Sequence, residues 1–193
     1  MAPDTLIDHL EQRLGRIEVG WSCDAGGDAV PFQVVRLPRG SGGGTISFAT
    51  VGLSRFRLRS PSGNDIRQEF LMIVPDRLRE GPLPALLQQV GMEVIAGGRP
   101  VLRGEVIGPR GALVAGSEME ALYAALPVYF PDDFAVYEAD DANVAIVWLV
   151  PISAGEASYV SSYGWKAFED RLVECDPDLT DIYRAPLSAA QLG

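Results

Sequence analysis

Hydrophobic residues occur along this chain only in short segments, and this limits what the chain can fold into. The longest apolar run, Val144 to Ile152, has nine residues. A membrane-spanning helix needs about 20 residues, so this run is too short to be one. A run of this length instead suits a strand buried on both faces of a sheet. Phe70 to Val74 has the same character, and shorter apolar segments recur around residues 101–107, 121–130 and 134–137.

Other stretches have the period of an amphipathic helix. They cover residues 4–14, where Asp4 or Thr5 is available as the N-cap, and residues 82–97. A third stretch begins at Ser153 and is followed by a second helical segment after Gly164. Ser153 and Glu156 have the spacing of a capping box, which predicts a helix N-terminus at this point. In the segment after Gly164 we expect Trp165 to be buried and to attach the helix to the sheet.

The order of strand-like and helical segments predicts an α/β (α+β) fold, a single domain with a mixed, largely antiparallel sheet flanked by helices. The length of 193 residues fits one domain, and we expect residues 1–193 to form it. Phe70, Val147 and Leu149 are the residues that we expect in the middle of the core.

Charge is distributed unevenly along the chain. The 16 basic and 26 acidic side chains give a formal net charge of −10. Residues 1–110 hold 13 basic and 12 acidic side chains, whereas residues 111–193 hold 3 and 14. A protein that binds nucleic acid needs a basic surface for the phosphates, so we expect no nucleic-acid binding by the domain as a whole. A basic protein partner remains open.

The first residues and the cysteines both bear on the compartment. The segment Met1 to Asp4 lacks the basic start of a signal peptide and leads into an amphipathic stretch, so we expect a cytoplasmic protein that does not bind a membrane. Cys23 and Cys175 are far apart and form no CxxC pair. In a reducing cytosol we expect two independent thiols, with a disulfide or a reactive thiol as the alternative.

Catalytic and cofactor motifs are hard to assemble from this sequence. No GxSxG motif occurs, and the only histidine, His9, lies within the first predicted helix, where we expect it on the surface. One histidine and no cysteine pair make a zinc site improbable. The glycine-rich segment Gly40 to Thr45 lacks a GK[ST] ending and joins two predicted strands, so we interpret it as a surface loop. We therefore expect no enzyme, no metal and no cofactor.

Five carboxylates form the one cluster that invites a chemical interpretation. They flank the short predicted strand 134–137, and they are Asp132, Asp133, Glu138, Asp140 and Asp141. Paired carboxylates can hold Mg²⁺ or act as acid and base, but four extended residues would separate the two Asp pairs by about 13 Å. Solvated turns are the first interpretation, contacts with a partner the second, and a metal site the last.

A stripe of arginines precedes the central apolar strand. Arg55, Arg57 and Arg59 alternate with Phe56 and Leu58. Strict alternation predicts a strand whose arginines all lie on one face. We interpret this face as solvated, and internal pairing with the acidic residues is the alternative.

Several segments carry, in their order and spacing, a resemblance to a known family. They are Val51–Ser54, Glu69–Pro75 (EFLMIVP), Leu83–Leu87, Leu102–Ile107, Gly116–Tyr123, Pro127–Phe134 (PVYFPDDF), Val147–Ile152 (VWLVPI), the Gly164–Leu172 helix and a tail from Asp176 to Arg184. Together they resemble the Suppressor-of-fused (SUFU) family in its bacterial, single-domain form. The resemblance covers about residues 45–187, and residues 1–44 add an N-terminal helix and strands.

This resemblance implies a non-enzymatic protein-binding domain. Eukaryotic members look like scaffolds that sequester a transcription factor, and bacterial members are placed as immunity proteins in polymorphic toxin systems. The second domain of the eukaryotic pattern is missing from these 193 residues, so a peptide clamp between two domains cannot be carried over. The resemblance assigns no binding residue to a position of this sequence.

Three functional interpretations follow from the resemblance and the charge. The first is an immunity protein that neutralises a cognate toxin in the bacterial cytoplasm, with the five carboxylates as partner-binding residues facing a basic, nuclease-like toxin. The second is a scaffold that holds an endogenous protein or peptide, for example by adding a strand to a sheet edge. The third, a remote one, is a carboxylate- or metal-dependent enzyme. The oligomeric state stays open.

Overall fold

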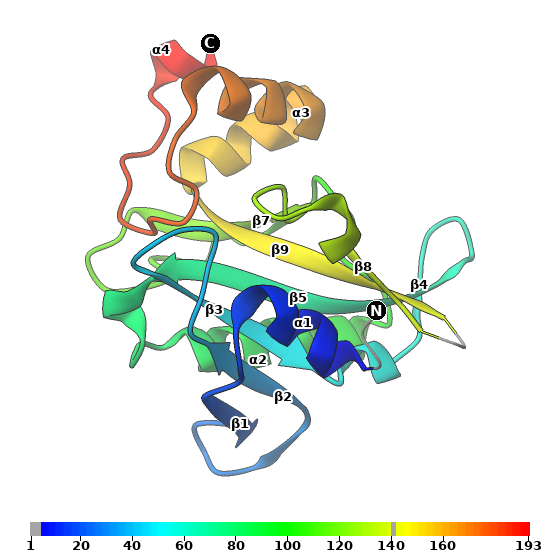
Figure 1. Cartoon of the computed structure of the whole chain (residues 1–193). Helices are drawn as coiled ribbons and strands as arrows, with labels where there is room; N and C mark the ends of the chain where they lie inside the picture. The colour runs from blue at the N-terminus through cyan, green and yellow to red at the C-terminus, as the bar shows by residue number, and fades with distance from the viewer. Residues whose placement is uncertain (1–4, 140–141) are drawn as a thin grey trace. The chain divides into compact units, whose positions relative to one another are not determined.

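The computed structural model describes residues 5–139 and 142–193 (Figure 1). The described part contains four α-helices and a mixed sheet of nine strands, which confirms the predicted α/β fold class. None of the helices in this part of the chain is long and apolar enough to cross a membrane.

The chain divides into two compact units. Residues 1–101 and 126–148 form the first unit, and residues 102–125 and 149–193 form the second. The strand β9 (Asn143–Ser153) contributes its first residues to one unit and its last residues to the other.

The first unit contains most of the strands. In sheet order these are β1 (Val19–Cys23), β2 (Ala29–Leu37), β3 (Thr45–Val51), β5 (Asp65–Pro75) and the first part of β9. Two short strands, β4 (Leu58–Arg59) and β8 (Val136–Glu138), pair with β5 and β9. Only β5 and β9 run parallel to each other, and the remaining strand pairs of this unit are antiparallel.

The middle of this sheet is buried on both faces, as the continuous apolar run in β5 predicts. Phe70 is fully buried, and so is Leu149 in the second unit, which confirms two of the three expected core residues. Val147, which pairs with Phe70, is only half-buried. Val147 lies between the buried residues Ile146 and Trp148 and therefore on the opposite face of β9, which is less covered at this point than the sequence suggested.

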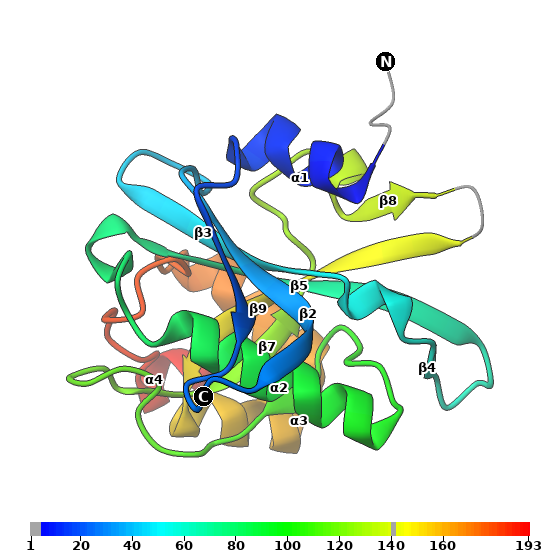
Figure 2. The same ribbon diagram turned by 90° about the horizontal axis from the view of Figure 1, so that it is seen from below.

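Two helices cover opposite faces of the first unit's sheet (Figure 2). They are α1 (Leu6–Leu14) and α2 (Leu83–Gly97). Thr5 caps α1 by accepting a hydrogen bond from the N–H of Asp8, as a helix N-cap should. Three short 3₁₀ helices also occur: η1 (Leu53–Arg55), η2 (Asp76–Leu78) and η3 (Asp132–Phe134).

His9 is not the surface residue that its place in an amphipathic helix suggested. Its side chain is only 8% exposed, and its Nε2 atom lies 3.0 Å from the carbonyl oxygen of Phe134. The imidazole also stacks on the Phe134 ring at a centroid distance of 5.4 Å. A residue about 125 positions away thus covers His9, which helical periodicity alone cannot reveal.

The predicted strand through Arg55 is also wrong, because Arg55 ends the 3₁₀ helix η1 and only Leu58 and Arg59 form β4. The cause is the buried carboxylate of Glu69 on β5. It accepts hydrogen bonds from the Thr50 hydroxyl and from the backbone N–H groups of residues 52, 53 and 54. These bonds hold the backbone of η1 in a tight turn. The alternation of exposed arginines with covered Phe56 and Leu58 nevertheless persists.

The second unit combines a small sheet with the C-terminal helices. Its strands follow the order β9, β7 (Met119–Ala125), β6 (Val106–Ile107), and its helices are α3 (Ala154–Cys175) and α4 (Ala189–Leu192). The predicted capping box is confirmed, since Ser153 and Glu156 bond each other's backbone at the start of α3. The backbone of α3 is non-helical at Gly164, where φ is +84°, and this allows the helix to change direction.

Trp165 does not attach α3 to the sheet, contrary to our expectation. Its side chain is 40% exposed, whereas Phe168 is fully buried and packs edge-on against Tyr123 of β7. Trp165 follows directly after the non-helical Gly164, one turn before Phe168, so it lies at the end of this helical segment and the buried contact is made one turn further along. Trp165 instead lies against Gly104 at the surface.

A buried ion pair fixes the C-terminal tail within the second unit. The carboxylate of Glu156 is fully buried and receives two hydrogen bonds from the guanidinium of Arg184, at 2.7 and 2.9 Å. The backbone N–H of Leu187 donates to the same carboxylate. The capping residue of α3 is therefore also the anchor of the tail.

The two cysteines do not pair with each other. Cys23 is exposed at the end of β1, and Cys175 is partly exposed at the end of α3. Both are free thiols, as the sequence predicted.

Candidate functional site

The five acidic residues predicted to bind a partner do not form a defined site in the described part of the chain. Asp132 and Asp133 lie in η3, which replaces the start of the predicted strand, and Glu138 ends β8. All three side chains are exposed. Asp140 and Asp141 lie outside the described residues.

One of these acids has an internal partner. Asp133 forms an ion pair with Arg13 of α1, with a distance of 3.1 Å between the guanidinium nitrogen and the carboxylate oxygen. The arginine stripe at residues 55–59 does not supply this partner. Within the residues that the structure describes, no group of three or more His, Cys, Asp or Glu side chains could hold a metal ion. The acidic residues therefore remain a candidate contact surface.

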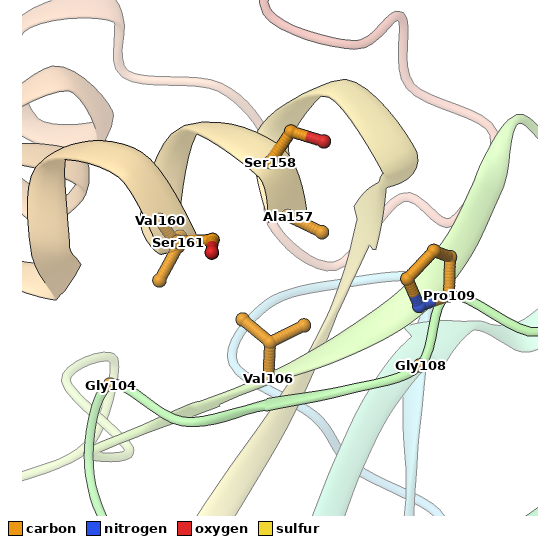
Figure 3. A pocket seen from close by; sticks show the side chains of 8 residues that line it. All are labelled: Gly104, Val106, Gly108, Pro109, Ala157, Ser158, Val160 and Ser161. Atoms are coloured by element: carbon orange, nitrogen blue, oxygen red, sulfur yellow. The ribbon is translucent and has the colours of Figure 1, made fainter.

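A groove in the second unit is better defined than the acidic surface. It lies between β6 and the first half of α3 and has a volume of about 500 Å³ (Figure 3). Its lining residues are Gly104, Val106, Gly108, Pro109, Ala157, Ser158, Val160 and Ser161. The side chain of Val106 points from the strand toward the helix (Figure 3). Gly108, Pro109, Ser158 and Ser161 are exposed, so the groove is open to solvent.

The strand side of this groove is a sheet edge. On its inner side, the backbone around β6 bonds β7: Gly104 donates to Ala124, and Ala124 donates to Glu105. In an antiparallel pair the bonding residues alternate. Because Glu105 is bonded inward, the N–H and C=O groups of Val106 point away from β7. Val106 is therefore positioned to pair with a further strand.

Trp165 packs against Gly104, one of the residues that line the groove. A Cβ atom on Gly104 would lie 2.3 Å from Cγ of Trp165, so the indole rests directly on the glycine backbone. The guanidinium of Arg103 lies over the same indole, 4.8 Å from the ring centroid, a distance suited to a cation–π contact. Any larger residue at position 104 would displace the indole.

Hydrogen bonds to α3 hold the side chains beside Trp165 in place. Arg103 donates to Glu169 of α3 at 3.0 Å, and the Tyr123 hydroxyl donates to the same carboxylate at 2.9 Å. The hydrogen bond to Glu169 raises the pKa of Arg103, and burial, followed by the bond to Glu169, raises the pKa of Tyr123. Both groups keep their protons near neutral pH, so the contacts of Arg103 and Tyr123 with α3 persist there.

The lining of the groove indicates what it can bind. It contains apolar side chains, two serine hydroxyls and backbone, and no carboxylate or imidazole. Such a surface can take an extended segment with small or apolar side chains but offers no acid, base or nucleophile pair. The groove was not predicted from the sequence, although Gly104, Val106 and Gly108 alternate in a way that is typical of an edge approached by another backbone.

Comparison with known proteins agrees with this fold. A family model described as Suppressor of fused protein (SUFU) matches residues 28–185. No curated protein sequence matches the chain significantly.

Three solved structures have a similar fold, each with a TM-score of 0.70. A SUFU homologue from Neisseria gonorrhoeae FA 1090 is 20% identical, over 95% of this chain and 95% of that one. The protein in the Sufu–Fu complex is 16% identical, over 96% of this chain and 91% of that one. Drosophila Suppressor of Fused is 16% identical over 96% of this chain, which matches 51% of the Drosophila chain.

Proposed function

The chain belongs to the Suppressor of fused protein (SUFU) family, and on this premise we propose that it is a non-enzymatic domain that binds an extended segment of a protein partner at the edge of β6. The observation that carries this proposal is the combination of an open sheet edge at Val106 with the groove beside it. Strand addition at such an edge is a common mode of peptide recognition.

Each part of the groove has a separate task in this mode of binding. The outward N–H and C=O of Val106 bond the partner's backbone, which supplies affinity without regard to sequence. Alternate side chains of the partner enter the space between Val106 and Ala157, where the lining favours apolar groups. Trp165 holds the neighbouring backbone at Gly104 in place.

The fold comparison supports a protein as the ligand. The similar structure of the Sufu–Fu complex is that of a protein bound to another protein. For the present chain, a lining of apolar side chains, backbone and two serines, with no carboxylate or imidazole to activate a hydroxyl, favours binding over catalysis.

A matched pair of variants tests the site. Peptides selected from a display library on the wild-type protein should lose binding to Ser161→Trp, whose indole fills the groove. They should bind Ser162→Trp unchanged, because Ser162 is exposed on the same helix but does not line the groove. Bound peptide should also slow amide hydrogen exchange at Val106, whose N–H gains an acceptor. Selected peptides that bind both variants equally and leave Val106 exchange unchanged would place the binding surface elsewhere.

More specifically, we propose that the chain is an immunity protein that neutralises a cognate toxin. The resemblance to the bacterial, single-domain form of the family supports this role, and so does the net acidity of the chain, which suits a basic toxin. Co-expression with the product of the adjacent gene provides the test. Growth should be restored by the wild-type chain and by Ser162→Trp but not by Ser161→Trp. A non-toxic neighbour would contradict immunity and leave the scaffold function as the better assignment.

A further inference from the structure

Three arginines on one short segment of the first unit have no acidic partner among the residues that the structure describes. The side chains of Arg55, Arg57 and Arg59 are exposed. None of them forms a hydrogen bond or an ion pair with any residue that the structure describes. Like charges this close repel one another, so a surface of this kind is best stabilised by an external anion.

Ten of the other twelve arginines contrast with this stripe. Six of them form ion pairs with acidic side chains: Arg13, Arg36, Arg79, Arg103, Arg171 and Arg184. Four more, Arg67, Arg77, Arg99 and Arg110, also interact with other groups. In a chain with 26 acidic and 16 basic side chains, three unpaired cations within five residues are a distinct feature of this segment.

The stripe is held on a rigid base. Leu58, between two of the arginines, is 1% exposed, and the backbone N–H of Arg59 donates to the carbonyl of Gly98 at 2.9 Å. Upstream, the buried carboxylate of Glu69 fixes η1, which ends at Arg55. The backbone is extended at Phe56 and in β4, so successive arginine Cα atoms are about 6.6 Å apart.

We propose that the stripe of Arg55, Arg57 and Arg59 is a second interaction surface, which binds an extended acidic segment of a protein. In an extended chain, every second residue also recurs at about 6.6 Å and points to the same side. Carboxylates at alternate positions therefore match the three guanidinium groups one to one. Guanidinium groups bind carboxylates in a planar, two-bonded geometry.

The overall charge favours an acidic protein segment over a nucleic acid as the occupant. A nucleic acid brings many phosphates, and the net charge of −10 on this chain repels those that extend beyond the stripe. A short segment with three carboxylates has no such excess. None of the three arginines lines the groove beside β6, so this surface does not depend on the proposed function of the groove.

A pair of peptides tests the spacing. The probe is a blocked heptapeptide of valine with aspartate at its second, fourth and sixth positions, and the comparison peptide has the same composition with its aspartates in succession. Binding is followed by ¹H–¹⁵N NMR shifts at low salt. The alternating peptide should shift the amides of residues 53–60 and bind more tightly than the comparison peptide.

Two triple variants of equal net charge complete the test. The variant Arg55→Gln/Arg57→Gln/Arg59→Gln should bind the alternating peptide with about tenfold lower affinity. Arg16→Gln/Arg39→Gln/Lys166→Gln removes three exposed cations elsewhere and should leave its affinity unchanged. Equal losses in both variants, equal affinity for the two peptides, or tighter binding of an eight-nucleotide oligothymidylate would each overturn the proposal. Amide shifts confined to residues outside 53–60 would do the same.

Discussion

A single buried carboxylate organises the loop that follows β3. Glu69 is fully buried in β5, yet no basic side chain is paired with it in the described part of the chain. Its charge is instead stabilised by one hydroxyl and three backbone N–H groups at distances from 2.6 to 3.2 Å. Bonds from several donors to one carboxylate are strong, and here they tie a central strand to η1.

Glu69→Gln should lower the free energy of unfolding by about 3 kcal/mol. The amide keeps one acceptor oxygen, but its NH₂ group would face N–H donors that then lose their partner. Urea denaturation of the variant measures the loss. Asp65→Asn is the matched control, because Asp65 is exposed on the same strand and its neutralisation should leave stability within about 0.5 kcal/mol. Equal midpoints for both variants would contradict the structural role of Glu69.

At the scale of elements, α3 is two helices joined at Gly164 with different tasks. The first half lines the groove through Ala157, Val160 and two serines, and its N-terminal Glu156 anchors the tail. The second half packs Phe168 against β7 and Trp165 against Gly104 beside the groove. The left-handed φ of Gly164 makes this division available at little cost, because glycine adopts such angles without strain.

Phe168→Ala should therefore destabilise the protein far more than Trp165→Ala. Removing the fully buried ring leaves a cavity and should cost about 4 kcal/mol, whereas the 40% exposed indole should cost about 1 kcal/mol through its packing and cation–π contacts. Chemical denaturation of both variants measures the difference. A larger loss for Trp165→Ala would show that the indole, and not Phe168, attaches the second half of α3.

At the scale of the whole molecule, the acidic excess and the arginine stripe lie in different parts of the chain. The acidic excess lies in residues 111–193, whereas the unpaired arginine stripe lies in the first half of the chain. Such an arrangement affects partner choice and association rate more than stability. The acidic surface and the arginine stripe are thus suited to different partners, or to different parts of one partner.

If the acidic surface contacts a basic toxin, neutralising it should weaken binding and reduce its salt dependence. The variant carries Asn or Gln at Asp132, Asp133, Glu138, Asp140 and Asp141. The loss of the Asp133–Arg13 pair should cost less than about 1 kcal/mol, so a thermal melt should still show a folded protein.

The control for this variant neutralises as many acids elsewhere on the surface. It carries Asn or Gln at Asp28, Asp65, Glu118, Glu120 and Asp170. This control should keep the affinity for the adjacent gene's product, measured by calorimetry at two salt concentrations. Unchanged affinity and salt dependence in the first variant would show that the partner contacts another surface.

The sequence by itself determined the local features of this protein. Helix starts at Thr5 and Ser153, the central strand around Phe70 and the break at Gly164 all follow from neighbouring residues, through capping, hydrophobic run length and glycine conformation. The family resemblance also rests on such short segments. These interactions act within a few residues, so their pattern is legible along the chain.

Only the tertiary structure decided which surfaces are covered and which are open. Phe134 covers His9, and hydrogen bonds to Glu69 hold the segment that ends at Arg55 in a 3₁₀ helix instead of a strand. Trp165 packs against Gly104 at the surface. The groove likewise exists because the distant segments β6 and α3 come together with Val106 at an unpaired edge. Contacts between residues tens of positions apart decide these features, and periodicity along the sequence contains no information about such distances.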